Sequence, residues 1–221
     1  MIRDELASPS PVSALAVVVI GVEPAVGCRN EAAVVLASSH DLLPKSLIAD
    51  LRTDHAGETG AVFIYRGMLA TTRHAEVRRF AQAHLATESA HLGLIEPLLA
   101  PRHRSLLLPL WRLAGWLTGA LPALVGPRAV YATVEAVETF VDRHYTEQIE
   151  SIDHLDPGHA HPALQALRGL LVSCRADEIG HRDEASALLA RNTKPASVAL
   201  RWWVWSVGAG SRSAVKVCRL V

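Results

Sequence analysis

Two short motifs of one kind, far apart in the chain, carry the strongest chemical signal in this sequence. Glu88 precedes His91 by three residues, and Glu178 precedes His181 by the same spacing. Side chains three residues apart share one face of a helix, so each motif presents a carboxylate and an imidazole together. One Glu-x-x-His is weak evidence because chance often supplies it, but two favour a metal site built from helices.

Two more glutamates stand where an aliphatic residue is expected. Glu58 and Glu138 lie on the apolar stripes of their own segments, as Glu88 and Glu178 do. A single glutamate of this kind is usually an edge residue or a partnered charge. Burying four carboxylates without compensation would cost many kcal/mol, because even one isolated buried charge costs several. Two divalent cations would neutralise all four.

The ligand chemistry favours iron or manganese. Four carboxylates and two imidazoles suit these metals, whereas a structural zinc site usually contains thiolates. The three cysteines, Cys28, Cys174 and Cys218, are widely spaced and form no Cys-x-x-Cys pair, so neither a zinc site nor a disulfide framework is indicated. We expect two Fe²⁺ ions per chain, and we interpret Cys174 as a packing residue.

Helical periodicity places these residues on four long segments. Apolar residues recur every three or four positions, and proline or glycine clusters separate the segments. The predicted helices cover residues 45–72, 75–96, 128–153 and 162–191. Their order of ligands is Glu, Glu-x-x-His, Glu, Glu-x-x-His, which is the arrangement of ferritin-like di-metal carboxylate bundles. We therefore predict an all-α, ferritin-like four-helix bundle, with a hydrophobic connection between its second and third helices and a C-terminal helical segment.

The charge distribution indicates a membrane surface rather than nucleic acid. The 221 residues hold 22 Lys+Arg and 22 Asp+Glu, and a neutral chain has no field to attract a polyanion. The mean hydropathy is +0.20. Residues 97–134 and 185–221 contain no acidic residue but all five tryptophans and several arginines. Such segments suit an anionic membrane surface.

Three interpretations remain open for the apolar run 106–125. It could span a bilayer, insert into one leaflet, or pack on the protein's own core. Pro109, Arg112 and Pro122 interrupt the run and argue against a span. We predict membrane-associating segments at 102–127 and 196–221 within a domain of residues 43–221. Residues 1–42 are expected to form a weakly structured N-terminal extension.

Several local motifs resemble one known family. They are Asp-His-Ala-Gly-Glu-Thr-Gly-Ala at 54–61 with Ile-Tyr at 64–65, Val-Glu at 137–138 leading to His-Tyr at 144–145 and Gln-Ile at 148–149, and Asp-Glu at 177–178 leading to His181. The sequence is similar here to the demethoxyubiquinone hydroxylases, from about Leu47 to the C-terminus. Thr87, residues 66–68 and the length of 156–162 depart from the family pattern, which concerns the surroundings of the metal more than its ligands.

The resemblance implies a di-iron monooxygenase of ubiquinone biosynthesis that hydroxylates a polyprenyl demethoxyubiquinol with O₂. Its metal ligands would be Glu58, Glu88, His91, Glu138, Glu178 and His181. His55, His144, Tyr145 and Asp177 are candidates for orienting the ligands or relaying electrons and protons, and each is equally interpretable as a hydrogen-bonded helix residue. His84 is interpreted as a core histidine.

The expected partners are the quinol, O₂, a membrane surface and an external electron donor. The sequence has no nucleotide-binding fingerprint, so the donor, NADH or a reductase, is left open, as is self-association. The expected location is peripheral, at the cytoplasmic face of the cell membrane if the source is bacterial. Two alternatives remain: a ferritin-like ferroxidase or iron-storage protein, and a membrane-bound helical scaffold without metal.

Overall fold

The computed structural model describes residues 44–191 and 195–221, and this part of the chain is helical, without strands. The helices are α2 (Lys45–Thr71), α3 (Ala75–Ile95), α4 (Leu108–Val125), α5 (Pro127–Leu155), α6 (Pro162–Ala190) and α7 (Val198–Cys218), with the 3₁₀ turns η1 (Glu96–Leu98) and η2 (Pro101–His103) between α3 and α4. The four predicted bundle helices are confirmed as α2, α3, α5 and α6, to within two residues at each end. The predicted extension 1–42 lies outside the described residues.

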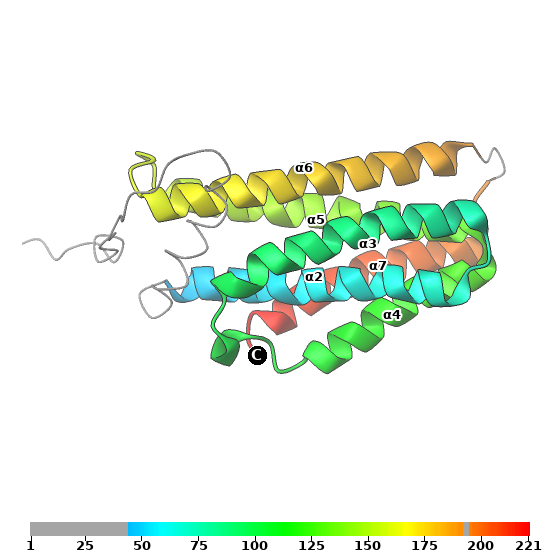
Figure 1. The fold of residues 1–221 in the computed structure, drawn as a ribbon, viewed down its shortest axis with the longest axis horizontal. Helices are drawn as coiled ribbons and strands as arrows, with labels where there is room; N and C mark the ends of the chain where they lie inside the picture. The colour runs from blue at the N-terminus through cyan, green and yellow to red at the C-terminus, as the bar shows by residue number, and fades with distance from the viewer. Residues whose placement is uncertain (1–43, 192–194) are drawn as a thin grey trace, which may run out of the picture.

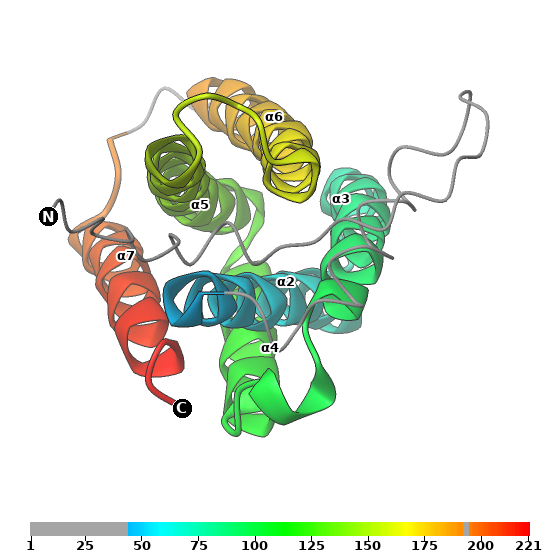
Figure 2. The same ribbon diagram turned by 90° about the vertical axis from the view of Figure 1, so that its left-hand side faces the viewer.

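The long helices run side by side and enclose one core (Figure 1). In the end-on view, α2 lies centrally, α5 and α6 lie on one side of it, and α4 lies on the other (Figure 2). Prolines at the first turn begin α4, α5 and α6, where the missing N–H breaks no helical hydrogen bond. The first-turn prolines therefore mark where these three helices begin.

Two apolar clusters flank the middle of the bundle. One contains Leu51, Leu167 and Tyr145, and the other contains Met68 and Val134. Along α2, α5 and α6, the predicted ligands lie between the residues of these two clusters. A buried polar layer is therefore held between two apolar layers, which fix the spacing of the helices around it.

The hydrophobic connection contains a helix, α4, packed on α2 at unusually close range. A Cβ on Gly119 would lie 1.8 Å from the Ile64 carbonyl oxygen, and one on Gly115 would lie 2.4 Å from the Gly60 oxygen. A Cβ on Gly67 would lie 2.1 Å from the Trp116 oxygen. No side chain fits at these points, so glycine is required by the contact of two backbones.

Helix α4 continues through both prolines of the apolar run. Pro109 lies in the first turn of α4 and Pro122 in its last turn. A proline in the first turn loses no helical hydrogen bond, and the Pro122 carbonyl still accepts from Gly126 N–H at 2.9 Å. Gly126, with φ 133°, then turns the chain into α5.

The outer faces of α4 and α7 expose large apolar side chains. On α4 these recur at helical spacing: Leu110, Leu113, Leu117, Leu121 and Leu124. On α7, Trp202 and Trp205 are 64% and 61% exposed. Within the described residues, no helix is long and apolar enough to cross a membrane. The connection thus packs one face on the bundle and presents the other outward.

Candidate metal centre

All six predicted ligands are buried and come together in the centre of the bundle. Helix α2 supplies one glutamate, α3 a glutamate and a histidine, α5 one glutamate, and α6 a glutamate and a histidine. Each of these residues is at most 8% exposed: Glu58, Glu88, His91, Glu138, Glu178 and His181. The helix register deduced from periodicity therefore turns all six inward.

The cluster divides into two overlapping groups of potential ligand atoms. One consists of Glu58, Glu88, His91 and Glu178, and the other of Glu88, Glu138, Glu178 and His181; within each group the ligand atoms lie within 4.8 Å of one another. Glu88 and Glu178 belong to both. Two ions at this spacing would share these two carboxylates, and each would have one further glutamate and one histidine of its own.

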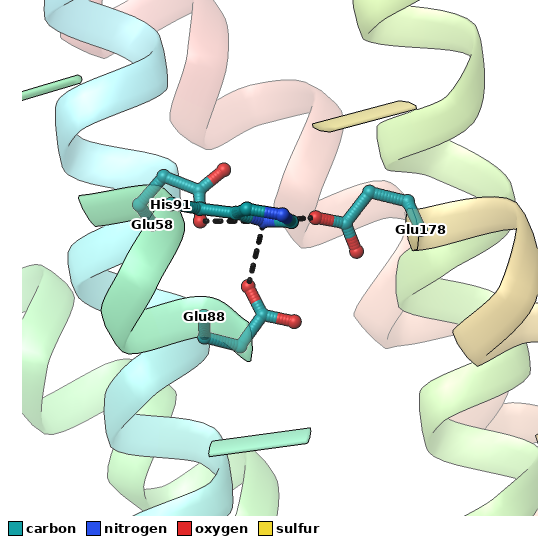
Figure 3. Close-up of side chains that lie close together, drawn as sticks. All are labelled: Glu58, Glu88, His91 and Glu178. Atoms are coloured by element: carbon teal, nitrogen blue, oxygen red, sulfur yellow. Dashed lines mark hydrogen bonds and ion pairs between the residues drawn. The ribbon is translucent and has the colours of Figure 1, made fainter. Parts of the chain in front are cut away.

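The imidazole of His91 lies among three carboxylates (Figure 3). Its Nδ1 is 3.1 Å from Glu178 Oε1, 3.8 Å from Glu58 Oε2 and 3.9 Å from Glu88 Oε2. On the other side, His181 Nδ1 is 3.1 Å from Glu88 Oε1 and 3.4 Å from Glu178 Oε2. Both histidines thus direct Nδ1 into the cluster.

Electrostatics show that the cluster lacks positive charge. Burial, reinforced by neighbouring carboxylates, raises the pKa of Glu58 to about 7 and raises the pKa values of Glu88 and Glu138 well above the usual range. Burial also opposes ionisation of Glu178, but His181 and His91 overcome it and lower the Glu178 pKa to about 2. Burial opposes the charge on His91, whereas Glu178 and Glu58 raise its pKa to about 9. Two histidines do not balance four carboxylates, and cations would.

Several buried atoms in the cluster also lack hydrogen bonds. They are Glu58 Oε2, Glu88 Oε1, Glu178 Oε2 and His181 Nδ1. An unpaired buried polar atom is costly, and native proteins normally satisfy such atoms with a partner, water or an ion. Four atoms of ligand type without hydrogen bonds, all within this cluster, fit a pair of hard cations such as iron or manganese.

Two of the four candidate supporting residues contact the cluster. The Tyr145 hydroxyl donates to Glu58 Oε1 at 2.5 Å, and Asp177 Oδ2 lies 3.1 Å from His91 Nε2. The other two point elsewhere: His55 Nε2 lies 3.7 Å from Glu96, and His144 Nε2 lies within 3.3 Å of Thr53, Asp54 and Gln148.

Sequence reasoning missed Tyr65, which it treated as part of an apolar stripe. Its hydroxyl donates to Glu138 Oε1 at 3.1 Å. A signal was present, because Tyr65 follows Glu58 by seven residues and Tyr145 follows Glu138 by seven residues. Each tyrosine reaches across the bundle to the glutamate of the other helix. Cys174 is buried in an apolar cluster, as expected for a packing residue.

A cavity of about 540 Å³ leads to the cluster from the side of α4 and α7. Glu58, Glu88, Glu138 and Glu178 line it, while mostly apolar residues of α2, α4, α5 and α7 form the remaining wall. This volume lies within the range of small-molecule sites. The wall also contains a group of polar residues from α2 and α5: Thr53, Asp54 and His144. Gln148 donates to Asp54 Oδ1 at 2.6 Å and fixes that group.

Comparison with known proteins assigns the family. The family model described as ubiquinone biosynthesis protein COQ7 matches residues 45–218, which include every helix described above. The chain belongs to the COQ7 family. This confirms the resemblance deduced from the local motifs.

Curated relatives of the COQ7 family carry hydroxylase names. A 3-demethoxyubiquinol 3-hydroxylase of Rhodospirillum rubrum is 35% identical over 176 residues, covering 77% of this chain and 76% of that protein. A mitochondrial NADPH-dependent 3-demethoxyubiquinone 3-hydroxylase of Mus musculus is 36% identical over 135 residues, or 60% of each chain. The Caenorhabditis elegans protein of the same name is 28% identical over 190 residues, covering 84% of this chain and 94% of that protein.

Proposed function

We propose that this protein is a di-iron monooxygenase that hydroxylates the ring of a polyprenyl demethoxyubiquinol with O₂, a late step of ubiquinone biosynthesis. The observation that carries the proposal is the joining of two features: an apolar cavity ends at a buried cluster of four glutamates and two histidines. The names of the COQ7-family relatives support this substrate and this reaction.

In the proposed site, Glu88 and Glu178 would help to hold both iron ions, because they belong to both groups of ligand atoms. Glu58 and His91 would hold one ion in addition, and Glu138 and His181 would hold the other. Two Fe²⁺ ions against four carboxylates give a neutral centre, which is far less costly to bury than the bare carboxylates. When bound, the irons supply the redox chemistry that activates O₂ for insertion of one oxygen atom into an electron-rich ring.

The chain's own residues bind and orient the substrate. The apolar walls of the cavity take the prenyl chain and exclude water, while the ring lies at the inner end beside the carboxylates. His144 and Asp54 also line the cavity, and we assign them to hydrogen bonding with ring oxygens. Tyr145 holds Glu58 so that its Oε2 stays directed into the cluster.

The substrate enters from a membrane surface in this proposal. The exposed leucines of α4, together with Trp202 and Trp205 of α7, form an apolar surface on the two helices that also wall the cavity. A lipid-soluble quinol would therefore pass from one leaflet into the site without crossing water. We propose peripheral attachment, at the cytoplasmic face in a bacterial source.

Electrons come from an external donor, NADH or a reductase, because the sequence has no nucleotide-binding fingerprint. The ferroxidase or iron-storage alternative would share the ligands. That function, however, does not require an apolar cavity beside α4 and α7, the two helices that expose apolar side chains. The observed surfaces therefore favour the hydroxylase.

Complementation tests the proposal. In a host blocked at hydroxylation of demethoxyubiquinol, the wild-type chain should restore ubiquinone, and the Glu178→Ala variant should not, because it loses a shared ligand. Glu147→Gln changes an exposed glutamate of α5 and serves as the matched control, with restoration expected. Protein levels are compared by immunoblot.

Two results would contradict the proposal. Failure of the wild-type chain at normal protein levels would remove the substrate assignment. Restoration by Glu178→Ala would show that the activity does not depend on this cluster.

A further inference from the structure

The two metal positions of the proposed site differ in what holds their ligands. Glu58 and His91 belong to one group alone, and Glu138 and His181 belong to the other alone. In the first group the supports are independent of each other: Tyr145 donates to Glu58, and Asp177 contacts His91 Nε2. These two supports come from different helices, α5 and α6.

In the second group, one side chain stands behind both ligands. The ring of His84 stacks on His181, with 3.9 Å between centroids and 26° between planes. His84 Nδ1 also lies 3.1 Å from the Tyr65 hydroxyl, which donates to Glu138 Oε1. A phenol has one proton and two lone pairs, so Tyr65 can serve both neighbours at once.

His84 is itself held on two further sides. Its Nε2 lies 2.9 Å from Glu184 Oε2 of α6. Phe80, one turn earlier on α3, packs against the His84 ring, with 4.0 Å between the two ring centroids. His84 is 2% exposed, whereas the Glu184 side chain is 54% exposed. When Tyr65 donates to Glu138, its oxygen accepts from His84 Nδ1–H, so the ring is held at Nδ1 and by packing against Phe80.

From this geometry we propose that His84 is a positioning residue that holds both unshared ligands of one metal position, Glu138 and His181, and leaves the other position to Tyr145 and Asp177. The inference rests on the proposed di-metal site and goes beyond it. The two positions should therefore bind metal with separable affinities, and loss of His84 should weaken one of them selectively. Outer residues of metal sites typically change affinity by about 10- to 100-fold.

The test measures binding of Mn²⁺ to the full-length protein after its metal has been removed with a chelator, by titration and electron paramagnetic resonance without oxygen. Wild type should bind about two ions with a spectrum of magnetically coupled neighbours. His84→Phe keeps an aromatic ring but loses both nitrogen contacts. It should keep one tight ion, bind the second at least about tenfold more weakly, and lose the coupled spectrum at limiting metal.

Four further variants sharpen the test. Tyr65→Phe removes the hydroxyl that joins His84 to Glu138 and leaves the stacking of His84 on His181. It should also weaken the binding of one ion, and it carries the test if His84→Phe does not fold. Asp177→Asn should also weaken the binding of one ion, because Asp177 contacts the proposed ligand His91. Combining it with His84→Phe should weaken both ions. Asp183→Asn, an exposed neighbour paired with Arg182, is the control and should bind as wild type.

The outcomes separate this inference from the proposed function. If wild type binds no pair of ions, the di-metal site itself is wrong. If wild type binds two and both His84→Phe and Tyr65→Phe match it, His84 has no positioning role. Equal weakening of both ions by the folded His84→Phe variant would also overturn the inference, because the claimed support is selective.

Discussion

Placing a methyl group at the crossing of α2 and α4 should separate these helices. In Gly119→Ala the new Cβ would lie 1.8 Å from the Ile64 carbonyl oxygen, whereas an ordinary C···O contact is about 3.3 Å or longer. Helix α4 must therefore retreat by about 1.5 Å, since a backbone oxygen cannot rotate away as a side chain can. Overpacking of this kind costs about 1–3 kcal/mol.

Helix propensity acts in the opposite direction and sets the net effect. Alanine is favoured over glycine in a helix by about 0.8–1.0 kcal/mol. A clash with a backbone atom belongs in the upper part of the overpacking range, about 2–3 kcal/mol, so Gly119→Ala should lose about 1–2 kcal/mol in total. For a chain of this size each kcal/mol shifts Tm by about 2–4 °C. Differential scanning calorimetry in mild detergent should therefore record a Tm lower by about 2–8 °C.

Gly169→Ala is the matched control for this substitution. Gly169 lies in α6, and a Cβ there would meet nothing within 4 Å. The propensity gain stands alone at this site, so Tm should rise by about 2–4 °C. A Gly119→Ala protein at least as stable as wild type would show that α4 does not rest on α2 by backbone contact.

Three more predictions concern the ligands, the metal and the membrane surface. Glu138→Gln should lose most activity and weaken one metal position, whereas Glu135→Gln, at a partly exposed site on the same helix, should keep activity within a few-fold; reversed phenotypes would mean that the register of α5 is wrong. Chelation should lower Tm measurably, because at a hundredfold excess over Kd a bound ion adds about 2.7 kcal/mol; an unchanged Tm would indicate an empty cluster. The double variant Trp202→Ser, Trp205→Ser should shift the protein from the membrane pellet to the supernatant. The control Trp203→Phe loses only a hydrogen bond to the bundle and should stay in the pellet. A wild-type protein found wholly in the supernatant would contradict membrane attachment.

The bundle and the inward glutamates were predictable because both depend on helical periodicity. Glu138 falls in line with Val134 and Tyr145 on the apolar stripe of α5, and the structure buries all three. Spacing within one helix is fixed by its geometry, so the register could be deduced from the sequence.

Contacts between helices could not be deduced in this way. The pairing of His84 with His181 joins α3 to α6, and its geometry depends on how two helices pack. The same holds for the contact of Gly119 with Ile64, because a glycine in an apolar run does not indicate which residue of another helix it will contact. The course of α4 through Pro109 and Pro122 could not be deduced from the sequence either, because it depends on how α4 packs on α2.

Metal content is the most direct test of the central claim. The full-length protein, expressed with iron available and purified without chelator, should contain close to two iron atoms per chain by elemental analysis, because four buried glutamates require about four compensating charges. A Glu88→Ala with Glu178→Ala double variant that remains helical should contain almost none. A folded wild-type protein without metal would contradict the account.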